Sequence, residues 1–599
     1  MSSSTGVIGA WQTLARFRGP RRAGSREAPS CGSRGSGRRC AARIRRRWDS
    51  GPAARNEAPA PLGSASLRRE QAEGFLASEG QPDSSRADSG QAGPRWPLLV
   101  LCVLVFSASL VAFTRNNSFP FYYHPSEPTK AGQLMEHEYN YLHPLLMLTS
   151  TQVSRKVLGV PDEHQAVVQV GRWVSAVYGS LAVALLLWIA GRLAGLAGGL
   201  CAAPFLALTP RLGELAHFMK EDPTLAMGVA AFLAALVSYG HRRTTGRLAF
   251  LALTTALACS AKYVGAVVLL VGLPAALLPR GEGRLASPGP RALIFLGVFL
   301  PLLAGLNYQV FRALPDLVAG VSHEVSHVTT GHYGFTHRVP HAAAFRALLG
   351  KTFAAPLAAV HLLWFFSAAR RRSFAEWVVT AFGFALLLSF SSIVAGRYLL
   401  PAELTLNLLA GLGLARLLLL ATAQAPRWRV PLAAGAAAGF AALLWPAFEE
   451  KAMEPFRHDT RKQLQAFVEE TLPPNAFILQ NRDVHLPTPG YWRHRGRDDF
   501  LDQEVSLVAP RGEFWSYEET LERGVTHVAL RLSVYLPYID KVDDELVEGF
   551  EEKFEQRRRF YQHVVDDGEL LWESPPELAW GRLTPRLRLF RIATPPAAP

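Results

Sequence analysis

The stretch that decides the fold spans residues 216–236 and reads AHFMKEDPTLAMGVAAFLAAL. From about Thr224 onward it is an apolar run, and a helix needs about 20 predominantly apolar residues to cross a bilayer. Three charged residues, Lys220, Glu221 and Asp222, stand directly before this run. Charged side chains at the end of a span are costly to desolvate unless they pair with one another or bind a ligand. The stretch therefore predicts a membrane span with a polar site at its start.

The composition of the whole chain extends this interpretation. Of the 599 residues, 49% are hydrophobic and only 19% are charged, and the mean hydropathy is +0.11. A soluble protein carries about a quarter of its residues as charged ones. The apolar residues are gathered in long runs, which indicates membrane helices. We expect about eleven spans, at 97–113, 167–189, 193–208, 224–239, 248–260, 264–278, 292–306, 353–367, 374–390, 398–420 and 430–445.

The distribution of positive charge predicts an orientation. The formal net charge is +14, and most of the excess lies in the N-terminal tail and in short loops between apolar runs. Every second loop is short and basic, such as the loop with Arg242, Arg243 and Arg247 and the one with Arg370–Arg372. This alternation follows the positive-inside rule and fits a membrane protein better than a nucleic-acid-binding one. We expect a cytoplasmic N-terminus and, after an odd number of crossings, a C-terminus outside.

Three regions differ in composition. Residues 1–96 are rich in Arg, Ser, Gly and Pro and are expected to form a disordered cytoplasmic tail, with a transit peptide or an untranslated upstream stretch as alternatives. Residues 97–448 form the expected transmembrane domain. Residues 449–599 mix helix-like stretches with strand-like ones such as AFILQ, THVALRL and LRLFRI. The fold class is therefore a polytopic α-helical membrane protein with a small C-terminal α/β domain on the outer face.

Further charges occur at the outer ends of the expected spans. Lys262 lies between two spans, Arg397 and Tyr398 begin another, and Glu403 lies slightly further inside it. Cations suit a phosphate group, and carboxylates suit a hydroxyl proton or a metal ion. The alternatives are that the basic side chains only reach the interface and that Asp222 caps the helix that follows it.

The first outer loop, residues 114–166, contributes Glu127, Lys130 and His143. Prolines on both sides of the Ser126–Glu127 pair restrict its backbone, which suits a group that must be held in place. The aromatic residues around them suit the membrane interface.

A second histidine-rich segment reads HEVSH at residues 323–327. It matches the H-E-x-x-H pattern of zinc proteases. The pattern fixes only three positions, and no third ligand follows at a defined spacing, although His332, His337 and His341 are near. We therefore favour loop histidines at the membrane interface over a zinc site.

The segments HPSEPTK…YNYLHPLLML, GRWVSAVYGSLAVALLLWIAGRLAG, HFMKEDPTLAMG, SAKYVGAVVLL and GRYLLPAELTLNLLAGLGLARLL occur in this order. In this order they resemble the GT-C superfamily of glycosyltransferases, and most closely the group of protein O-mannosyltransferases and aminoarabinose transferases. The resemblance covers roughly residues 113–445. It implies a donor in which a sugar is linked by phosphate to a polyprenyl lipid, and a site on the outer face next to the first two outer loops.

The resemblance also implies roles for residues. Members usually carry an acidic residue or an Asp-Glu pair in the first outer loop, where this chain has Ser126 and Glu127. We expect Glu127 to act as the base for a hydroxyl acceptor, and Glu221 and Asp222 to orient the acceptor or a divalent cation. One backside displacement would invert the anomeric centre. The expected substrate-binding and phosphate-binding residues are Lys130, His143, Lys220, Lys262, Arg397 and Tyr398.

Two other functions remain open from the sequence. A transporter or flippase also has many spans with charged residues, and a non-catalytic relative would explain the missing Asp at Ser126. We favour the enzyme because the charges lie at span ends and no internal repeat is evident. The expected acceptor is an extracytoplasmic protein, glycan or lipid, nucleic acid is not an expected partner, and the composition favours a bacterial inner membrane.

Overall fold

A computed structural model describes residues 96–277, 287–330, 354–367, 379, 396–481, 483–488, 500–507, 514–540, 551–578, 581 and 583–593. The expected N-terminal tail, residues 1–96, therefore lies outside the described residues except for Trp96, which is already helical. The expected span at 374–390 also lies outside them, apart from Val379.

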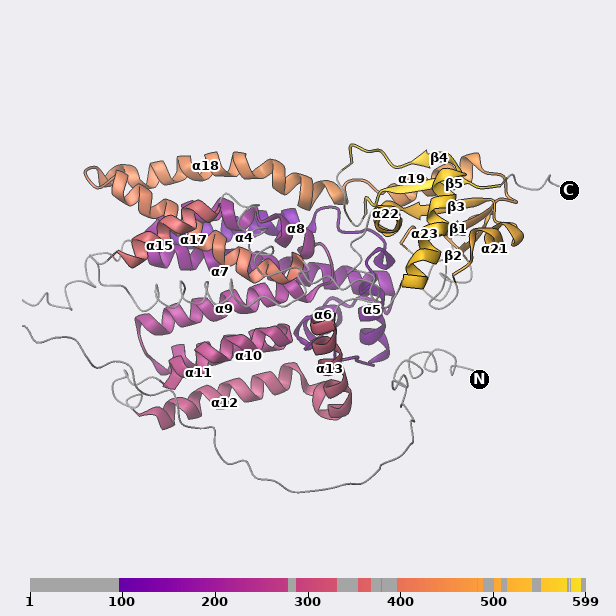
Figure 1. Cartoon of the computed structure of the whole chain (residues 1–599). Helices are drawn as coiled ribbons and strands as arrows, with labels where there is room; N and C mark the ends of the chain where they lie inside the picture. The colour runs from indigo at the N-terminus through magenta and orange to yellow at the C-terminus, as the bar shows by residue number, and fades with distance from the viewer. Residues whose placement is uncertain are drawn as a thin grey trace, which may run out of the picture. The chain divides into compact units, whose positions relative to one another are not determined.

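The structure is mostly helical, and six of its described helical segments are long and apolar enough to cross a membrane. They contain α4 (Trp96–Thr114), α7 (His164–Ala207), α9 (Glu221–His241), α12 (Pro288–Leu306), α17 (Leu400–Ala421) and α18 (Arg429–Phe448). Shorter apolar helices are α10 (Thr245–Ala261), α11 (Leu269–Leu277) and α15 (Ala354–Phe366). Figure 1 shows α9, α10 and α12 running alongside one another. This architecture supports a polytopic membrane protein.

Helix α7 contains the two apolar runs that the sequence predicted as separate spans. Its helical backbone is interrupted at Ala194 and at Gly195, where φ is +71°. Glycine adopts this left-handed region at low cost because it has no Cβ. The chain then folds back on itself, since a Cβ built on Gly199 would lie 3.9 Å from the Cα of Gly191. The two runs thus form a tight helical hairpin.

Burial differs sharply among the membrane helices. Helix α9 is enclosed along nearly its whole length, and Phe232 and Leu236 are fully buried. On α4 and α12, by contrast, large apolar side chains are exposed, such as Leu99 (62%) and Leu293 (76%). Exposed apolar surface of this kind suits contact with lipid tails. The start of α9 is therefore surrounded by other elements, which allows side chains from several of them to meet there.

Close helix packing depends on small residues. A Cβ at Gly413 of α17 would lie 1.9 Å from the backbone oxygen of Leu357 in α15. We expect Gly413→Ala to destabilise the protein by about 1–3 kcal/mol, because the helices must move apart. The measurement is the thermal unfolding midpoint in detergent. Gly435→Ala on α18 is the control, since nothing lies within 4 Å of its Cβ position; equal midpoints for both variants would contradict the packing argument.

Short elements connect the helices on the side where α9 begins. The first loop contains η2 (Phe121–Tyr123), α5 (Glu127–Glu136) and α6 (Leu146–Leu158), and α8 (Pro210–Ala216) precedes α9. Beyond α12 lie η5 (Tyr308–Arg312), α13 (Leu314–Thr330) and, before α17, η6 (Gly396–Leu399). The sequence predicted that the HEVSH segment lies in a loop, whereas in the structure it lies within helix α13. The side chains of residues 324–327 and all of His332, His337 and His341 are outside the described part.

The C-terminal part contains a five-stranded mixed sheet with the strand order β2-β1-β3-β5-β4. Strand β1 is parallel to β2 and β3, whereas β5 is antiparallel to β3 and β4. Neighbouring residues alternate between two cores, with Ile478 in one and Leu479 in the other, as the two-residue period of a strand requires. The elements are α19 (Thr460–Thr471), β1 (Phe477–Gln480), β2 (Glu504–Leu507), α21 (Tyr517–Glu522), β3 (His527–Arg531), α22 (Leu532–Ile539), α23 (Glu551–Asp566), β4 (Glu569–Glu573) and β5 (Leu587–Arg591).

The C-terminal part contacts the loops before α9 directly. The Tyr123 hydroxyl donates to Asp459 at 2.9 Å, and the His217 ring stacks on Phe456 with ring centroids 4.0 Å apart. Burial lowers the pKa of His217 to about 4, so its ring is neutral at pH 7. These contacts link α19 to the first loop and to the segment that leads into α9.

Candidate active site

The start of α9 is fixed by the backbone of Lys220. Lys220 is the N-cap residue, with extended φ and ψ of −128° and 148°, and the helix begins at Glu221. The backbone N–H of Lys220 donates to Ser175 Oγ at 3.0 Å, and this hydroxyl donates to the Lys220 carbonyl at 3.2 Å. The idea that Asp222 caps this helix is therefore wrong. Asp222 lies in the first turn, where negative charge still interacts favourably with the helix dipole.

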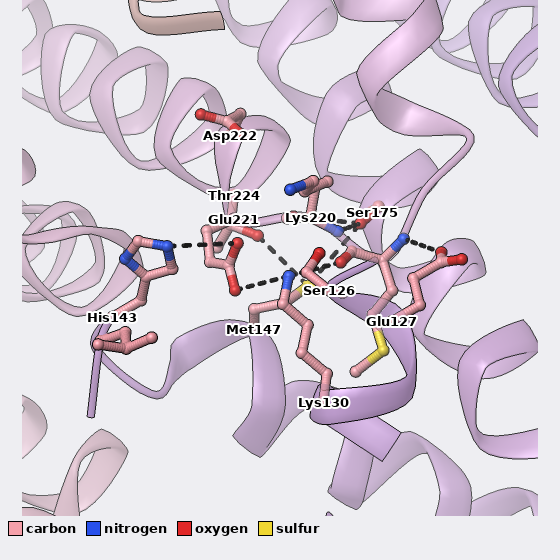
Figure 2. Close-up of polar contacts among 12 residues, drawn as sticks. Ser126, Glu127, Lys130, His143, Met147, Ser175, Lys220, Glu221, Asp222 and Thr224 are labelled. Atoms are coloured by element: carbon pink, nitrogen blue, oxygen red, sulfur yellow. Dashed lines mark hydrogen bonds and ion pairs between the residues drawn. The ribbon is translucent and has the colours of Figure 1, made fainter. Parts of the chain in front are cut away.

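One group of charges joins α9 to the first loop. Lys130 of α5 lies 2.7 Å from Glu221 Oε1 and donates to the Met219 carbonyl at 2.6 Å. His143 Nε2 lies 4.0 Å from the other Glu221 oxygen. Figure 2 shows Lys130 and His143 approaching this carboxylate from different sides. Glu221 is thus held between two residues of the first loop.

A second group joins α9 to η6 and to the end of α10. Lys262 Nζ donates to Asp222 Oδ1 at 2.9 Å. The ring of Tyr398 lies 5.1 Å from Lys262 Nζ and 5.2 Å from Arg397 Cζ, and Arg397 Nη2 donates to the Tyr398 hydroxyl at 3.3 Å. The Tyr398 ring is therefore close to two cations, and cation–π attraction stabilises such contacts. Asp222 points away from Glu221, so the two groups diverge from adjacent residues (Figure 2).

Lys220 lies in the same region but differs from the other cations. Its relative exposure is 7%, and its ammonium has no hydrogen-bond or ion-pair partner among the described residues. Burial, together with the charge of Lys130, lowers the pKa of Lys220 to about 7. We call the following set the α9 charge cluster: Lys130, His143, Lys220, Glu221, Asp222, Lys262, Arg397 and Tyr398. Its four Lys and Arg side chains outnumber its two carboxylates, so the cluster suits an anion.

Glu127 is not free to face this cluster. Its side chain is fully buried, and Arg172 of α7 donates to both carboxylate oxygens, from Nε at 3.0 Å and from Nη2 at 2.7 Å. The Met219 N–H donates to the same carboxylate at 2.8 Å. Asp222, Lys262 and Arg397 are thus linked by contacts, directly or through Tyr398, whereas the expected base Glu127 is ion-paired with Arg172.

Arg172 was not identified from the sequence. Its remaining donors bind the carbonyls of Asn117 and Phe119 at 2.9 and 2.6 Å and of Pro120 at 3.4 Å, and its guanidinium lies 3.5 Å from the Phe119 ring centroid. The signal was a lone charge inside an apolar run, which usually marks a site or a structural pair. Arg172 thus fastens the first part of this loop, between Asn117 and Glu127, to α7.

Glu403 also takes no part in the cluster. Its carboxylate is ion-paired with Arg211 of α8. This pair joins α17 to α8, and holding these two helices together is a sufficient role for Glu403.

The two adjacent carboxylates do not fit a divalent-cation site. Ca²⁺ and Mg²⁺ prefer several oxygen ligands that converge on one point. Here Glu221 and Asp222 diverge, and each is ion-paired with a lysine. Within the described ranges, no group of three His, Cys, Asp or Glu residues suits a metal. We therefore assign neither residue as a metal ligand.

Comparisons with known proteins give the following matches. Residues 156–304 match the model of the family described as dolichyl-phosphate-mannose-protein mannosyltransferase. Two solved structures of ArnT from Cupriavidus metallidurans, bound to undecaprenyl phosphate and in the apo state, are 15% identical to this chain. They cover 82% of it and 97% and 99% of their own length, with TM-scores of 0.44 and 0.45.

The oligosaccharyltransferase of Archaeoglobus fulgidus is 12% identical, covers 80% of this chain and 72% of its own, and has a TM-score of 0.40. No curated protein sequence matches. The family match contains Arg172, all the α9 residues of the cluster and Lys262. It confirms that residues 156–304 of this chain resemble the protein mannosyltransferase family.

Proposed function

We propose that the protein is a membrane glycosyltransferase that moves a sugar from a polyprenyl-phosphate carrier to an extracytoplasmic acceptor, with inversion. The observation that carries this proposal is the excess of positive charge, on buried and half-buried side chains, at the start of α9. A phosphate whose lipid lies in the membrane is the ligand that such a cluster, at the end of an apolar helix, would bind. The family match over residues 156–304 supports the same class of donor.

The contacts support a division of roles. Arg397 and Lys262, with Tyr398 between them, would bind the phosphate and stabilise the charge that develops on it as the sugar leaves. Lys130 and Glu221, next to His143, offer paired donors and acceptors that suit sugar or acceptor hydroxyls. Glu127 would act as a positioning residue, because it holds the first loop through Arg172 and has no surface from which to accept a substrate proton.

The same proposal includes the setting of the enzyme. Residues 97–448 would form the transferase domain, and residues 449–599 an extracytoplasmic α/β domain in contact with it. The proposed location is a bacterial inner membrane, which the composition favours. The alternating basic loops support a cytoplasmic N-terminus.

The test is transfer by the detergent-purified chain. It is incubated with dolichyl-phosphate mannose and with undecaprenyl-phosphate aminoarabinose, in the presence of a membrane and periplasmic extract as the source of acceptor. We expect free lipid phosphate to appear with one donor, at a rate that depends on the extract. A transporter, a flippase or a non-catalytic relative would bind or move the donor but release no lipid phosphate, and that result would contradict the proposal.

A further inference from the structure

A glycosyl transfer to a hydroxyl group needs a base, because the acceptor oxygen must lose its proton as it bonds to the sugar. The carboxylates nearest the start of α9 are poorly suited to this task. Glu127 is paired with Arg172, Glu221 with Lys130, and Asp222 with Lys262. A carboxylate that is held by a cation binds a proton weakly.

Lys220 is the exception in this region. Its amine has no partner in the part of the chain that the structure describes, although its backbone is fixed on both sides by Ser175. The charged groups that act on it are Lys130 of α5, Glu221 and Asp222 of α9, and Arg397 of η6.

The surroundings of Lys220 favour its neutral form. Burying an ammonium without a partner costs several kcal/mol, so the proton is lost more readily than in water. The pKa near 7 that burial gives this amine suits a general base at physiological pH. Lysine is the residue type that shifts in this way, because its ammonium is a strongly hydrated point charge.

We propose that Lys220 accepts the proton of the acceptor and that the acceptor is therefore a hydroxyl compound and not a phosphate. This inference rests on the proposed function. The hydroxyl oxygen forms a bond to the anomeric carbon, while the bond from that carbon to the carrier phosphate breaks and leaves its electron pair on the phosphate oxygen. The hydroxyl proton moves to Lys220 Nζ, and the ammonium returns it to water after the products leave.

Charge neutrality supports this assignment. With Lys220 neutral, the remaining three cations of the α9 charge cluster exceed its two carboxylates by one charge. The donor is a phosphodiester with one negative charge, so the complex with substrate is neutral. After transfer the lipid carries a phosphate monoester with about two negative charges near pH 7, and the protonated Lys220 raises the excess to two. The buried site thus stays balanced on both sides of the reaction.

The experiment compares pH–rate profiles of the full chain and its Lys220 variants. For the wild type, kcat/KM should fall tenfold per pH unit below about pH 7, because the base must be deprotonated. Lys220→Arg keeps the charge but cannot act as a base, so it should lower kcat by about 100-fold or more and lose the pH limb near 7. Its Kd for undecaprenyl phosphate should stay within a factor of three of the wild-type value. Lys462→Arg, on the exposed side of α19, is the matched control and should behave as the wild type.

The Lys220→Gln variant tests whether a loss of activity arises from misfolding. Removing a buried amine that has no partner among the described residues should leave the thermal midpoint unchanged or raise it, while activity is lost. A near-normal kcat in Lys220→Arg, or weaker lipid-phosphate binding with an unchanged kcat, would show that Lys220 binds the phosphate through its charge and does not act as a base. Either result would overturn this inference but not the proposed function. If the wild type releases no lipid phosphate with any donor, the proposed function fails, and this inference fails with it.

Discussion

Replacing Arg397 by Gln is expected to lower kcat for sugar transfer by about 100-fold or more, the usual effect of removing one group that stabilises charge in a transition state. Arg397 binds Tyr398 and is ion-paired with no carboxylate among the described residues. The substitution therefore removes positive charge from the proposed phosphate position without leaving a buried acid unpaired. Initial rates of lipid-phosphate release, measured with the donor that supports transfer, give the effect.

Two further variants sharpen this prediction. Arg397→Lys keeps the positive charge but loses the planar guanidinium, which can donate two parallel hydrogen bonds to a phosphate. We therefore expect kcat to fall by an intermediate factor of about ten. Lys262→Gln removes a neighbouring charge but also leaves Asp222 unpaired, so it should lower both activity and the thermal midpoint. Wild-type kcat in Arg397→Gln would exclude this residue from the phosphate site.

The second large effect concerns Glu127 and Arg172. Glu127→Gln should destabilise the protein by about 3–5 kcal/mol, because it leaves the guanidinium of Arg172 buried without its anion. Transfer should be lost as well, since the first loop carries Lys130 and His143. Thermal unfolding in detergent and transfer rates, measured on the same preparations, separate the two effects.

The double variant Glu127→Gln with Arg172→Met decides between a base and a positioning residue. With both charges removed, most of the lost stability should return, because no uncompensated charge stays buried. If Glu127 only positions the loop, part of the transfer activity should return too. A double variant that regains its wild-type midpoint but stays inactive would restore Glu127 as the base.

The start of α9 illustrates how far the sequence allowed prediction of the site. Lys220, Glu221 and Asp222 were identified because charge next to an apolar run is costly and therefore informative. The same argument identified Lys262, Arg397 and Tyr398, and the structure brings all three to the start of α9. It applied equally to Arg172, which was missed because its charge lies within a span and not at its end.

Ion-pair partners could not be read from the chain. Glu127 and Glu221 both lie close to the ends of apolar runs and look equivalent in sequence, yet one is paired with Arg172 of α7 and the other with Lys130 of α5. The distances that decide this depend on how α5 packs against α7 and α9. Lys220 likewise could not be distinguished from its neighbours, because its lack of a partner is a property of the surrounding elements.

The sequence by itself determined that this is a polytopic helical membrane protein, because hydrophobic run length is a local property that the thickness of the bilayer converts directly into spans. It also determined where costly charges lie along the chain. Only the tertiary structure decided which of those charges neutralise one another, because ion pairs form between groups as far apart in the chain as Arg211 and Glu403, which are separated by 192 residues. Among the described residues, that difference separates Glu127 and Arg172, which hold the first loop, from Lys220, which we propose accepts a proton.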